Sequence, residues 1–260
     1  MPAVIHYVVL TTGSCGNCYI FHDGEKSIVI DCGVTYTKLY NGMSEHGIDP
    51  SSVEAMFLTH LHPDHAKGVG VFQRRTGKTV YVSETAWHNG KSEMAKQKME
   101  IEDVKMMKWG ETVEAGSFSV TPFRTSHDSP GSCGYLIKRG EDSIFLMTDT
   151  GLVPEEAYGY ARDCRVKFIE SNYDENMLLS GFYPEWLKER VRGPYGHLSN
   201  RDAVDFALSV SSFGDQIYFI HVSENNNDIN LLKEYALSRI PSGIFCRCCE
   251  RGEMFEGFLD

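Results

Sequence analysis

The heptapeptide Thr59-His60-Leu61-His62-Pro63-Asp64-His65 concentrates three histidines and one aspartate in a single short loop. The apolar run Ala55–Thr59 predicts a strand that leads directly into it, and the carboxyl ends of strands are where α/β folds commonly place their ligands. Neutral imidazole nitrogens and a carboxylate suit zinc, manganese or iron. A purely structural role is poorly motivated, because three histidines this close would repel one another when protonated. We therefore predict His60, His62, Asp64 and His65 as metal ligands.

One short loop seldom completes two coordination spheres, so further ligands are expected at the ends of other strands. His127 follows the predicted strand Ser117–Ser126, Asp149 follows Ser143–Thr148, and His221 follows Gln216–Ile220. Taken singly, each is a residue type that often serves as a satisfied polar side chain. Together with the histidine-rich loop, they predict a site for two metals.

Strand-like and helical runs alternate along the chain and indicate an α/β (α+β) fold. The strand-rich first half and mixed second half predict a four-layer αββα sandwich of two mixed β-sheets flanked by helices. The chain contains no repeat or linker, so we expect a single domain over residues 1–260. The predicted strands are Val4–Leu10, Cys18–His22, Ser27–Asp31, Ala55–Thr59, Thr79–Ser83, Ser117–Ser126, Gly134–Lys138, Ser143–Thr148, Val166–Glu170, Gln216–His221 and Gly243–Cys248. The predicted helices are Thr35–His46, Asp64–Arg75, Thr85–Lys98, Pro154–Asp163, Pro184–Val191, Asn200–Val210 and Asp228–Ser238.

Composition and charge restrict the classes of function. Hydrophobic residues make up 42% and charged residues 23% of the chain, with neither a signal-peptide pattern nor a long apolar run. We therefore expect a cytoplasmic location and no membrane partner. A net charge of −11 disfavours a general nucleic-acid binder, because phosphate contacts supply most of that affinity. Local basic clusters at Lys67–Lys78 and at Lys188–Arg192 are either solvated helical faces or places for a phosphate backbone.

The eight cysteines are not expected to form disulfides in a chain without an export signal. Cys15-Gly16-Asn17-Cys18 and Cys246-Arg247-Cys248-Cys249 are dense enough to suggest a structural zinc, but the second group lacks the usual spacer. Buried thiols in turns explain both groups equally simply, and we favour that interpretation.

The predicted ligands together resemble the metallo-β-lactamase superfamily in its five-motif form. Ile28-Val29-Ile30-Asp31-Cys32-Gly33 is similar to the first motif, whose aspartate supports the metal loop without binding metal. The resemblance implies the αββα fold and two divalent ions, zinc or manganese. It assigns His60, His62 and His127 to the first ion and Asp64, His65 and His221 to the second, with Asp149 bridging them and Asp31 as the supporting residue.

Two later segments narrow the class of substrate that we expect. Phe168-Ile169-Glu170-Ser171-Asn172 and Gly196-His197-Leu198-Ser199-Asn200 resemble loops of the tRNA 3′-processing ribonucleases of this superfamily. That resemblance implies a catalytic set of Asp64, Glu170 and His197, in which Glu170 orients His197 and His197 protonates the leaving oxygen. The structural alternative is that Glu170 forms a strand-end ion pair and His197 is a loop residue near a helix N-terminus.

Among these nucleases the chain looks most like the small single-domain YycJ/WalJ-type exodeoxyribonuclease branch. The similar stretches are Gly13–Cys18, His62–Gly68, Thr148–Gly151, Gly196–Asn200 and His221–Asn226. This implies a 5′-to-3′ exonuclease on single-stranded or frayed DNA, with substrate contacts from Arg192, Ser199, Asn200, Ser223 and Asn225. Tyr173 departs from the branch, which commonly has a histidine in that segment. The interval from Asp149 to His221 leaves no room for a large nucleic-acid clamping domain, and no long arm for tRNA is evident.

The expected reaction is therefore phosphodiester hydrolysis by a hydroxide that two metals activate near neutral pH, with His197 as the acid. A rival enzyme hypothesis keeps the metals but assigns a small thioester or lactone substrate, as in glyoxalase II-like enzymes. A non-enzymatic metal-binding module is disfavoured, because all seven ligand positions are filled.

Overall fold

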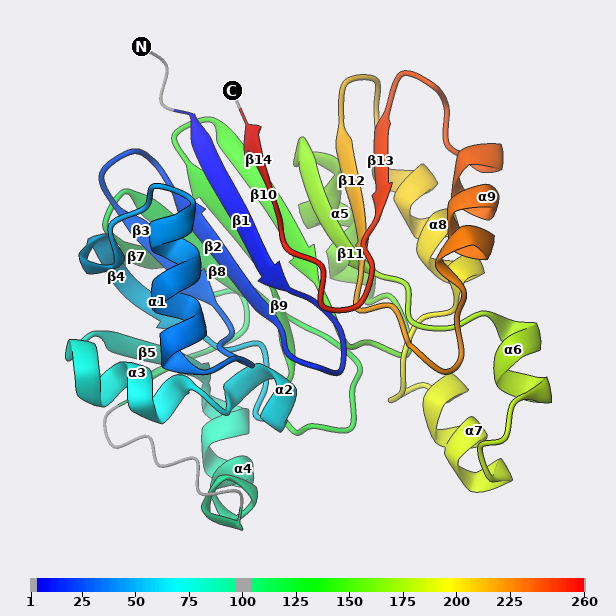
Figure 1. Ribbon diagram of the computed structural model, residues 1–260, viewed down its shortest axis with the longest axis horizontal. Helices are drawn as coiled ribbons and strands as arrows, with labels where there is room; N and C mark the ends of the chain where they lie inside the picture. Colours follow the sequence, from blue (N-terminus) through cyan, green and yellow to red (C-terminus); the bar gives the residue numbers. More distant parts are fainter. Residues whose placement is uncertain (1–3, 97–103, 260) are drawn as a thin grey trace.

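Two β-sheets form the centre of the computed structural model, which describes residues 4–96 and 104–259 (Figure 1). The first sheet has the strand order β14-β1-β2-β3-β4-β5-β6 and the second has the order β13-β12-β11-β10-β9-β8-β7. The bounds of the first sheet are β1 Ile5–Thr11, β2 Cys18–His22, β3 Ser27–Ile30, β4 Val53–Phe57, β5 Thr79–Ser83, β6 Val104–Met107 and β14 Phe255–Leu259. Those of the second are β7 Val113–Ala115, β8 Phe118–Arg124, β9 Cys133–Arg139, β10 Asp142–Met147, β11 Val166–Glu170, β12 Gln216–Ile220 and β13 Phe245–Cys248.

Helices cover the outer face of each sheet. The first sheet carries α1 Tyr36–Glu45, α3 Val69–Thr76 and α4 Glu84–Lys96, and the short helices η1 Pro50–Ser52 and α2 Pro63–Ala66 lie in its loops. The second sheet carries α5 Glu155–Arg162, α8 Asn200–Val210 and α9 Ile229–Arg239. Two more helices, α6 Glu175–Ser180 and α7 Glu185–Arg192, project from the edge of the molecule beside the lower end of the sheets (Figure 1).

Three apolar clusters correspond to the three interfaces between these layers. The cluster between the sheets includes Tyr7, Phe57 and Phe168, all buried. The other two clusters join each sheet to its own helices. Each sheet is mixed: β1 pairs antiparallel with β2 and β4 parallel with β5 in the first, and β10 pairs antiparallel with β9 and parallel with β11 in the second. The predicted four-layer αββα sandwich of two mixed sheets is confirmed.

The predicted helix Asp64–Arg75 is wrong in one respect, because the chain forms α2 and α3 with a break between them. The break places Gly68 against the loop after β3, where its backbone N–H donates to the Cys32 carbonyl oxygen at 2.9 Å. A β-carbon on Gly68 would lie 2.0 Å from the carbonyl oxygen of Val34. The helix is interrupted so that the loop after β3 can pack closely against the histidine-rich loop.

The remaining differences concern short elements, most of them edge strands. The sequence did not predict β6, β7, β14 or α6, each of which is at most six residues long. Edge strands of this length have little periodicity to detect. The last two residues of the predicted helix Thr85–Lys98 lie outside the described residues.

The turn between β2 and β3 ties the two sheets together through one carboxylate. Asp23 accepts hydrogen bonds from the backbone N–H groups of Glu25 and Lys26 within its own turn. Its Oδ2 also accepts from the Ser117 hydroxyl, in the turn between β7 and β8 of the second sheet, and from the Arg139 Nε of β9 at 2.9 Å. Burial acts to raise the pKa of Asp23, but these hydrogen bonds outweigh it and hold that pKa well below its ordinary value.

We predict that Asp23→Asn lowers the free energy of unfolding at pH 7 by about 1–3 kcal/mol, because the amide cannot accept from all four donors. A depressed carboxyl pKa stabilises the fold above the unfolded-state pKa of about 4 and loses this contribution as the pH falls through the folded-state value. The difference between variant and parent in denaturant unfolding should therefore shrink below about pH 4. Asp163→Asn, at an exposed aspartate, is the control. An equal loss at pH 7 and pH 3 would contradict this explanation.

Candidate metal centre

The histidine-rich loop lies at the carboxyl end of β4, where the two sheets come together. His62 is the residue before α2, and Pro63 occupies the first turn of that helix, where its missing N–H leaves no bond unmade. His60 and His65 are buried, whereas His62 remains partly exposed. The His60 Nε2 and the His62 Nδ1 lie 3.1 Å apart, so both rings point to the same place.

Three other strands end in residues with a left-handed backbone. Asp31 follows β3, Asp149 lies two residues after β10 and His221 follows β12, and their φ angles are 59°, 48° and 56°. Among the described residues these are the non-glycine positions with positive φ. Such conformations are costly, and they persist where the surrounding structure enforces them, often at functional sites. Two of the turns direct Asp149 and His221 into the space between the sheet ends, and the third directs Asp31 against the histidine-rich loop.

The side chains that we predicted as ligands converge in that space. The donor atoms of His60, His62 and His127 lie within 4.8 Å of one another, and so do those of Asp64, His65 and His221. Asp149 belongs to a further group of this kind with His60 and His65. The Asp149 Oδ2 lies 3.2 Å from the His65 Nε2, and its Oδ1 lies 3.5 Å from the His221 Nε2. The structure thus brings all seven residues together around one candidate metal site, with Asp149 between the two triads.

The chemistry of these donors fits divalent metal ions. The His221 Nε2 is buried and has no hydrogen-bond partner among the described residues, although it faces the carboxylates of Asp64 and Asp149. A buried polar atom without a partner is destabilising unless it binds something. Burial, assisted by the charge of His65, holds the pKa of His60 well below its ordinary value, so this imidazole is neutral and able to ligate.

His221 titrates in the opposite direction. Burial acts to lower the pKa of His221, but the charge of Asp149, the nearby Asp64 carboxylate and the hydrogen bond to Glu170 raise it to about 10. The surrounding carboxylates therefore favour a positive charge at this place. A divalent cation would supply this positive charge.

Asp31 supports the loop from behind. Its Oδ1 accepts from the backbone N–H of Thr59 at 2.8 Å, and its Oδ2 accepts from the Thr59 hydroxyl at 2.7 Å. The same Oδ2 accepts from the Nδ1–H of His65 at 2.7 Å, which leaves the Nε2 of that ring facing Asp149. This is the arrangement by which carboxylates commonly fix the tautomer of a metal-binding histidine.

Glu170, at the end of β11, is fully buried and accepts from four donors. Its Oε1 accepts from the Nδ1 of His197 at 2.6 Å and from the Nδ1 of His221 at 3.1 Å. Its Oε2 accepts from the backbone N–H groups of Thr150 and Leu198. Burial would raise the pKa of Glu170, but the charge of His197 and these hydrogen bonds lower it, so the carboxylate is ionised.

A cleft of about 380 Å³ opens over the candidate site. It is lined by Ser14, His62, Asp64, His127, Asp149, Asn172, Tyr183, Leu187, Arg190, Val191, His197, His221, Ser223, Asn225 and Asn226. Two of the predicted substrate contacts, Ser223 and Asn225, lie in this lining. The other three do not border the cleft.

The structure gives those three residues other partners. Ser199 is buried and caps the N-terminus of α8, and its hydroxyl also donates to the carboxylate of Asp202. Asn200 is buried too, with its amide bonded to Ser171 and Asn227. The guanidinium of Arg192 bonds to Glu189 on its own helix. Because their polar atoms are buried and already hydrogen-bonded, the structure argues against the predicted substrate contacts of Ser199 and Asn200.

Sequence reasoning missed several residues of the site. Asp128 lies 3.5 Å from the His62 Nε2 and forms an ion pair with Arg190 of α7 at 2.6 Å. The Nδ2 of Asn17 lies 2.9 Å from the His65 Nε2, and the Nδ2 of Asn172 donates to the His221 carbonyl oxygen at 2.9 Å. Two of these residues could have been found from their positions in the sequence. Asp128 directly follows the predicted ligand His127, and Asn172 lies in the segment Phe168–Asn172 that resembles a nuclease loop.

The cysteines and the remaining histidines lie elsewhere. No cysteine belongs to the potential metal-binding clusters of the described residues, and the thiols of Cys18, Cys32 and Cys249 are buried. His6 and His46 both contact the Glu256 carboxylate at 2.8 Å. Within residues 4–96 and 104–259, no helix has the length and apolar character needed to cross a bilayer.

Comparison with known proteins agrees with this geometry. Residues 26–222 match the family described as "Beta-lactamase superfamily domain". The exodeoxyribonuclease WalJ of Streptococcus pneumoniae is 30% identical over 222 residues, which cover 85% of this chain and 82% of WalJ. The exodeoxyribonuclease YycJ of Bacillus anthracis is 28% identical over 253 residues, covering 97% and 94% of the two chains.

Among solved structures, the metallo-beta-lactamase fold protein YhfI from Bacillus subtilis superposes with a TM-score of 0.72. The superposition covers 98% of this chain and 100% of YhfI at 18% identity. At that level of identity the similarity concerns the fold alone.

We predict that Asp31→Asn weakens metal binding by about 10- to 100-fold while the protein stays folded. An amide in place of the carboxylate turns one hydrogen-bond acceptor into a donor, so the proton on the Nδ1 of His65 is no longer fixed. The Nε2 is then no longer kept unprotonated and free to bind metal. Metal titration against a chromogenic chelator measures the affinity, and circular dichroism measures the fold. Asp49→Asn, at an exposed aspartate, is the matched control. Parental affinity in Asp31→Asn would show that Asp31 does not orient the loop.

Proposed function

The chain belongs to the beta-lactamase superfamily, and from this premise we propose that it is a metal-dependent phosphodiesterase that removes nucleotides from DNA ends. The observation that carries the proposal is the contact between Glu170 and His197 beside the candidate metal site. Activation of a water molecule requires only the residues that bind the metal ions, so it does not explain this contact. A histidine held by a buried carboxylate at the edge of the same cleft adds a proton donor for a poor leaving group.

Two divalent ions, zinc or manganese, fit the donors, with the residues divided as the triads suggest. His60, His62 and His127 would hold one ion, Asp64, His65 and His221 the other, and Asp149 would lie between them. Such ions supply Lewis acidity, which offsets the charge of the phosphate group and makes water a better nucleophile. The protein supplies fixed, mostly buried ligand atoms at the base of the cleft.

His197 is suited to act as the general acid. Its Nδ1–H donates to Glu170, so the Nε2 is the atom that can carry a proton into the cleft. Burial acts to lower the pKa of His197, but the charge of Glu170 and the hydrogen bond to it raise that pKa. This shift favours the protonated ring. The ring can transfer its proton from the Nε2 to the departing oxygen as the phosphodiester bond breaks.

The segment containing α6 and α7 supports a nucleic-acid strand as the substrate. One side of α7 faces the cleft with Leu187, Arg190 and Val191. No residue of α7 is buried, and nearby Phe182 and Trp186 are 90% and 68% exposed. Exposed aromatic side chains beside basic ones are typical of surfaces on which unpaired bases stack. This favours a single-stranded or frayed end over an intact duplex.

We predict that the purified protein, supplied with zinc or manganese, shortens 5′-phosphorylated single-stranded DNA from one end. Asp64→Asn should lose this activity, because the variant removes a carboxylate that faces His65 and His221. RNA, a glutathione thioester and a lactone are tested as substrates in the same way. Hydrolysis of the thioester or lactone with no cleavage of DNA would overturn the nuclease proposal in favour of a small acyl substrate.

We further predict that His197→Ala lowers kcat for DNA cleavage by at least about 100-fold, the range expected for loss of a general acid. The metal content, measured by inductively coupled plasma mass spectrometry, should stay at the parental value. His88→Ala, at an exposed histidine of α4, is the matched control. Loss of metal from His197→Ala would instead identify His197 as a ligand.

A further inference from the structure

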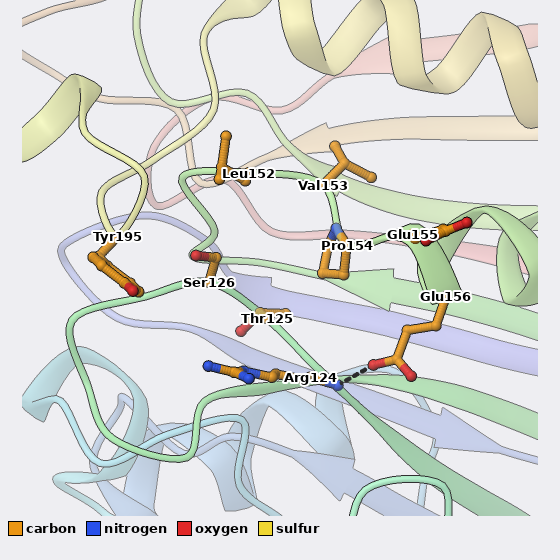
Figure 2. Close-up of a pocket in the computed structure, with 9 residues that line it drawn as sticks. All are labelled: Arg124, Thr125, Ser126, Leu152, Val153, Pro154, Glu155, Glu156 and Tyr195. Atoms are coloured by element: carbon orange, nitrogen blue, oxygen red, sulfur yellow. Dashed lines mark hydrogen bonds between the residues drawn. The ribbon is translucent and has the colours of Figure 1, made fainter.

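A second pocket, of about 680 Å³, is lined by residues of the loops that also carry candidate metal ligands (Figure 2). Thr125 and Ser126 line it immediately before His127, Leu152 lines it three residues after Asp149, and Tyr195 lines it two residues before His197. Its size falls within the range of about 300–1,000 Å³ that is common for small-molecule sites. No residue of its lining belongs to the lining of the cleft.

Short hydrogen bonds fix these loops. The Ser126 hydroxyl donates to the Pro194 carbonyl oxygen at 2.6 Å, and the Gly151 N–H donates to the Ser126 carbonyl oxygen at 2.7 Å. The His127 Nδ1 lies 3.1 Å from the Gly196 carbonyl oxygen. The same loops therefore present ligand candidates to one side and pocket residues to the other.

The walls suit a flat and partly apolar group. Tyr195 and Leu152, 59% and 57% exposed, stand at one end of the pocket, with Pro154 and Arg124 on its other sides (Figure 2). Exposed apolar side chains around a concave surface indicate binding. An aromatic ring and a guanidinium group are the side chains on which nucleobases stack.

The pocket also offers polar groups to the edge of a base. The hydroxyl of Thr125 is buried and has no hydrogen-bond partner among the described residues. The adjoining helix α5 begins after Pro154, which provides no side-chain cap for the first N–H groups of the helix. A hydroxyl and uncapped amides can bond to the ring nitrogens and carbonyl oxygens of a base.

Charge argues against a phosphate in this pocket. Glu155 and Glu156 face it, whereas Arg124 is the basic residue of its lining. The Oε1 of Glu156 accepts from the backbone N–H of Arg124 at 2.9 Å, as Figure 2 shows, so this carboxylate is held in place. A neutral group is therefore favoured over an anion.

We propose that this pocket binds the base of a nucleotide next to the scissile phosphate, and that Tyr195 is the residue on which that base stacks. The proposal rests on the proposed function, because the occupant is part of a nucleic-acid strand held at the metal centre. The pocket sets the position of the strand without taking part in the chemical step.

The test compares a long and a short substrate. Tyr195→Ala should raise KM for a single-stranded oligonucleotide by about tenfold, whereas hydrolysis of bis(p-nitrophenyl) phosphate should change much less, because that diester reaches only the cleft. Tyr195→Phe, which keeps the ring, should restore most of the lost affinity. Leu152→Ser tests the neighbouring wall and should act in the same direction. Phe213→Ala, at an aromatic side chain that is 90% exposed and outside both pockets, is the control.

A single abasic nucleotide, moved along the oligonucleotide, locates the bound base. In the parent one position should raise KM, and in Tyr195→Ala the same change should have no further effect, as expected for two groups in contact. Additive effects at every position would overturn the base pocket, and so would an equal loss on both substrates in Tyr195→Ala. A parent that cleaves the oligonucleotide with no dependence on Tyr195 or Leu152 overturns the base pocket alone. A parent that cleaves neither substrate overturns the proposed function and the pocket with it.

Discussion

The site depends on three sharp turns made by residues that are not glycine. Asp31, Asp149 and His221 each adopt a left-handed backbone at or just beyond the end of a strand, at an expected strain of about 1–3 kcal/mol apiece. A threonine hydroxyl stabilises each of them: Thr59 bonds to Asp31, Thr148 to the carboxylate of Asp149, and Thr12 accepts from the backbone N–H of His221. Because these turns aim the side chains inward, buried donors meet in a small volume. Relaxing any of the three would turn its side chain away from the others.

Neither sheet contains the site by itself. The first sheet supplies Asp31 and the loop from His60 to His65, and the second supplies His127, Asp149, Glu170 and His221. Glu170 links several loops of the second sheet, since its four donors come from the loops after β10 and β12 and the loop before α8. The docking of the two sheets over their common core therefore assembles the donors. Stability of the fold and affinity for metal are coupled for this reason.

Much of this arrangement could be predicted from the sequence, because long strands and dense ligand clusters leave clear patterns. The ends of β2, β5, β11 and α8 fall where the residues predicted them, and all seven predicted donors meet. The contact between Glu170 and His197 was inferred by resemblance, since residues 27 positions apart carry no local signal of contact. The short edge strands were missed for lack of periodicity. Ser199 and Asn200 were predicted as substrate contacts because they lie in a loop that resembles a nuclease loop. In the structure, Ser199 caps the following helix and the polar atoms of both residues already form hydrogen bonds, which the sequence does not reveal.

The pairing of β14 with β1 has a consequence for how the protein is made. Ile5 lies opposite Leu259 in the first sheet, so this pair joins residues at nearly the largest separation that the chain allows. The ribosome delivers residues in order, and contacts of such long range are slow to form. Throughout translation β1 therefore presents an open edge of unpaired N–H and C=O groups, of the kind on which other chains can add. A nascent chain that stalls before Phe255 keeps that edge open, so the pairing of β14 with β1 protects against aggregation.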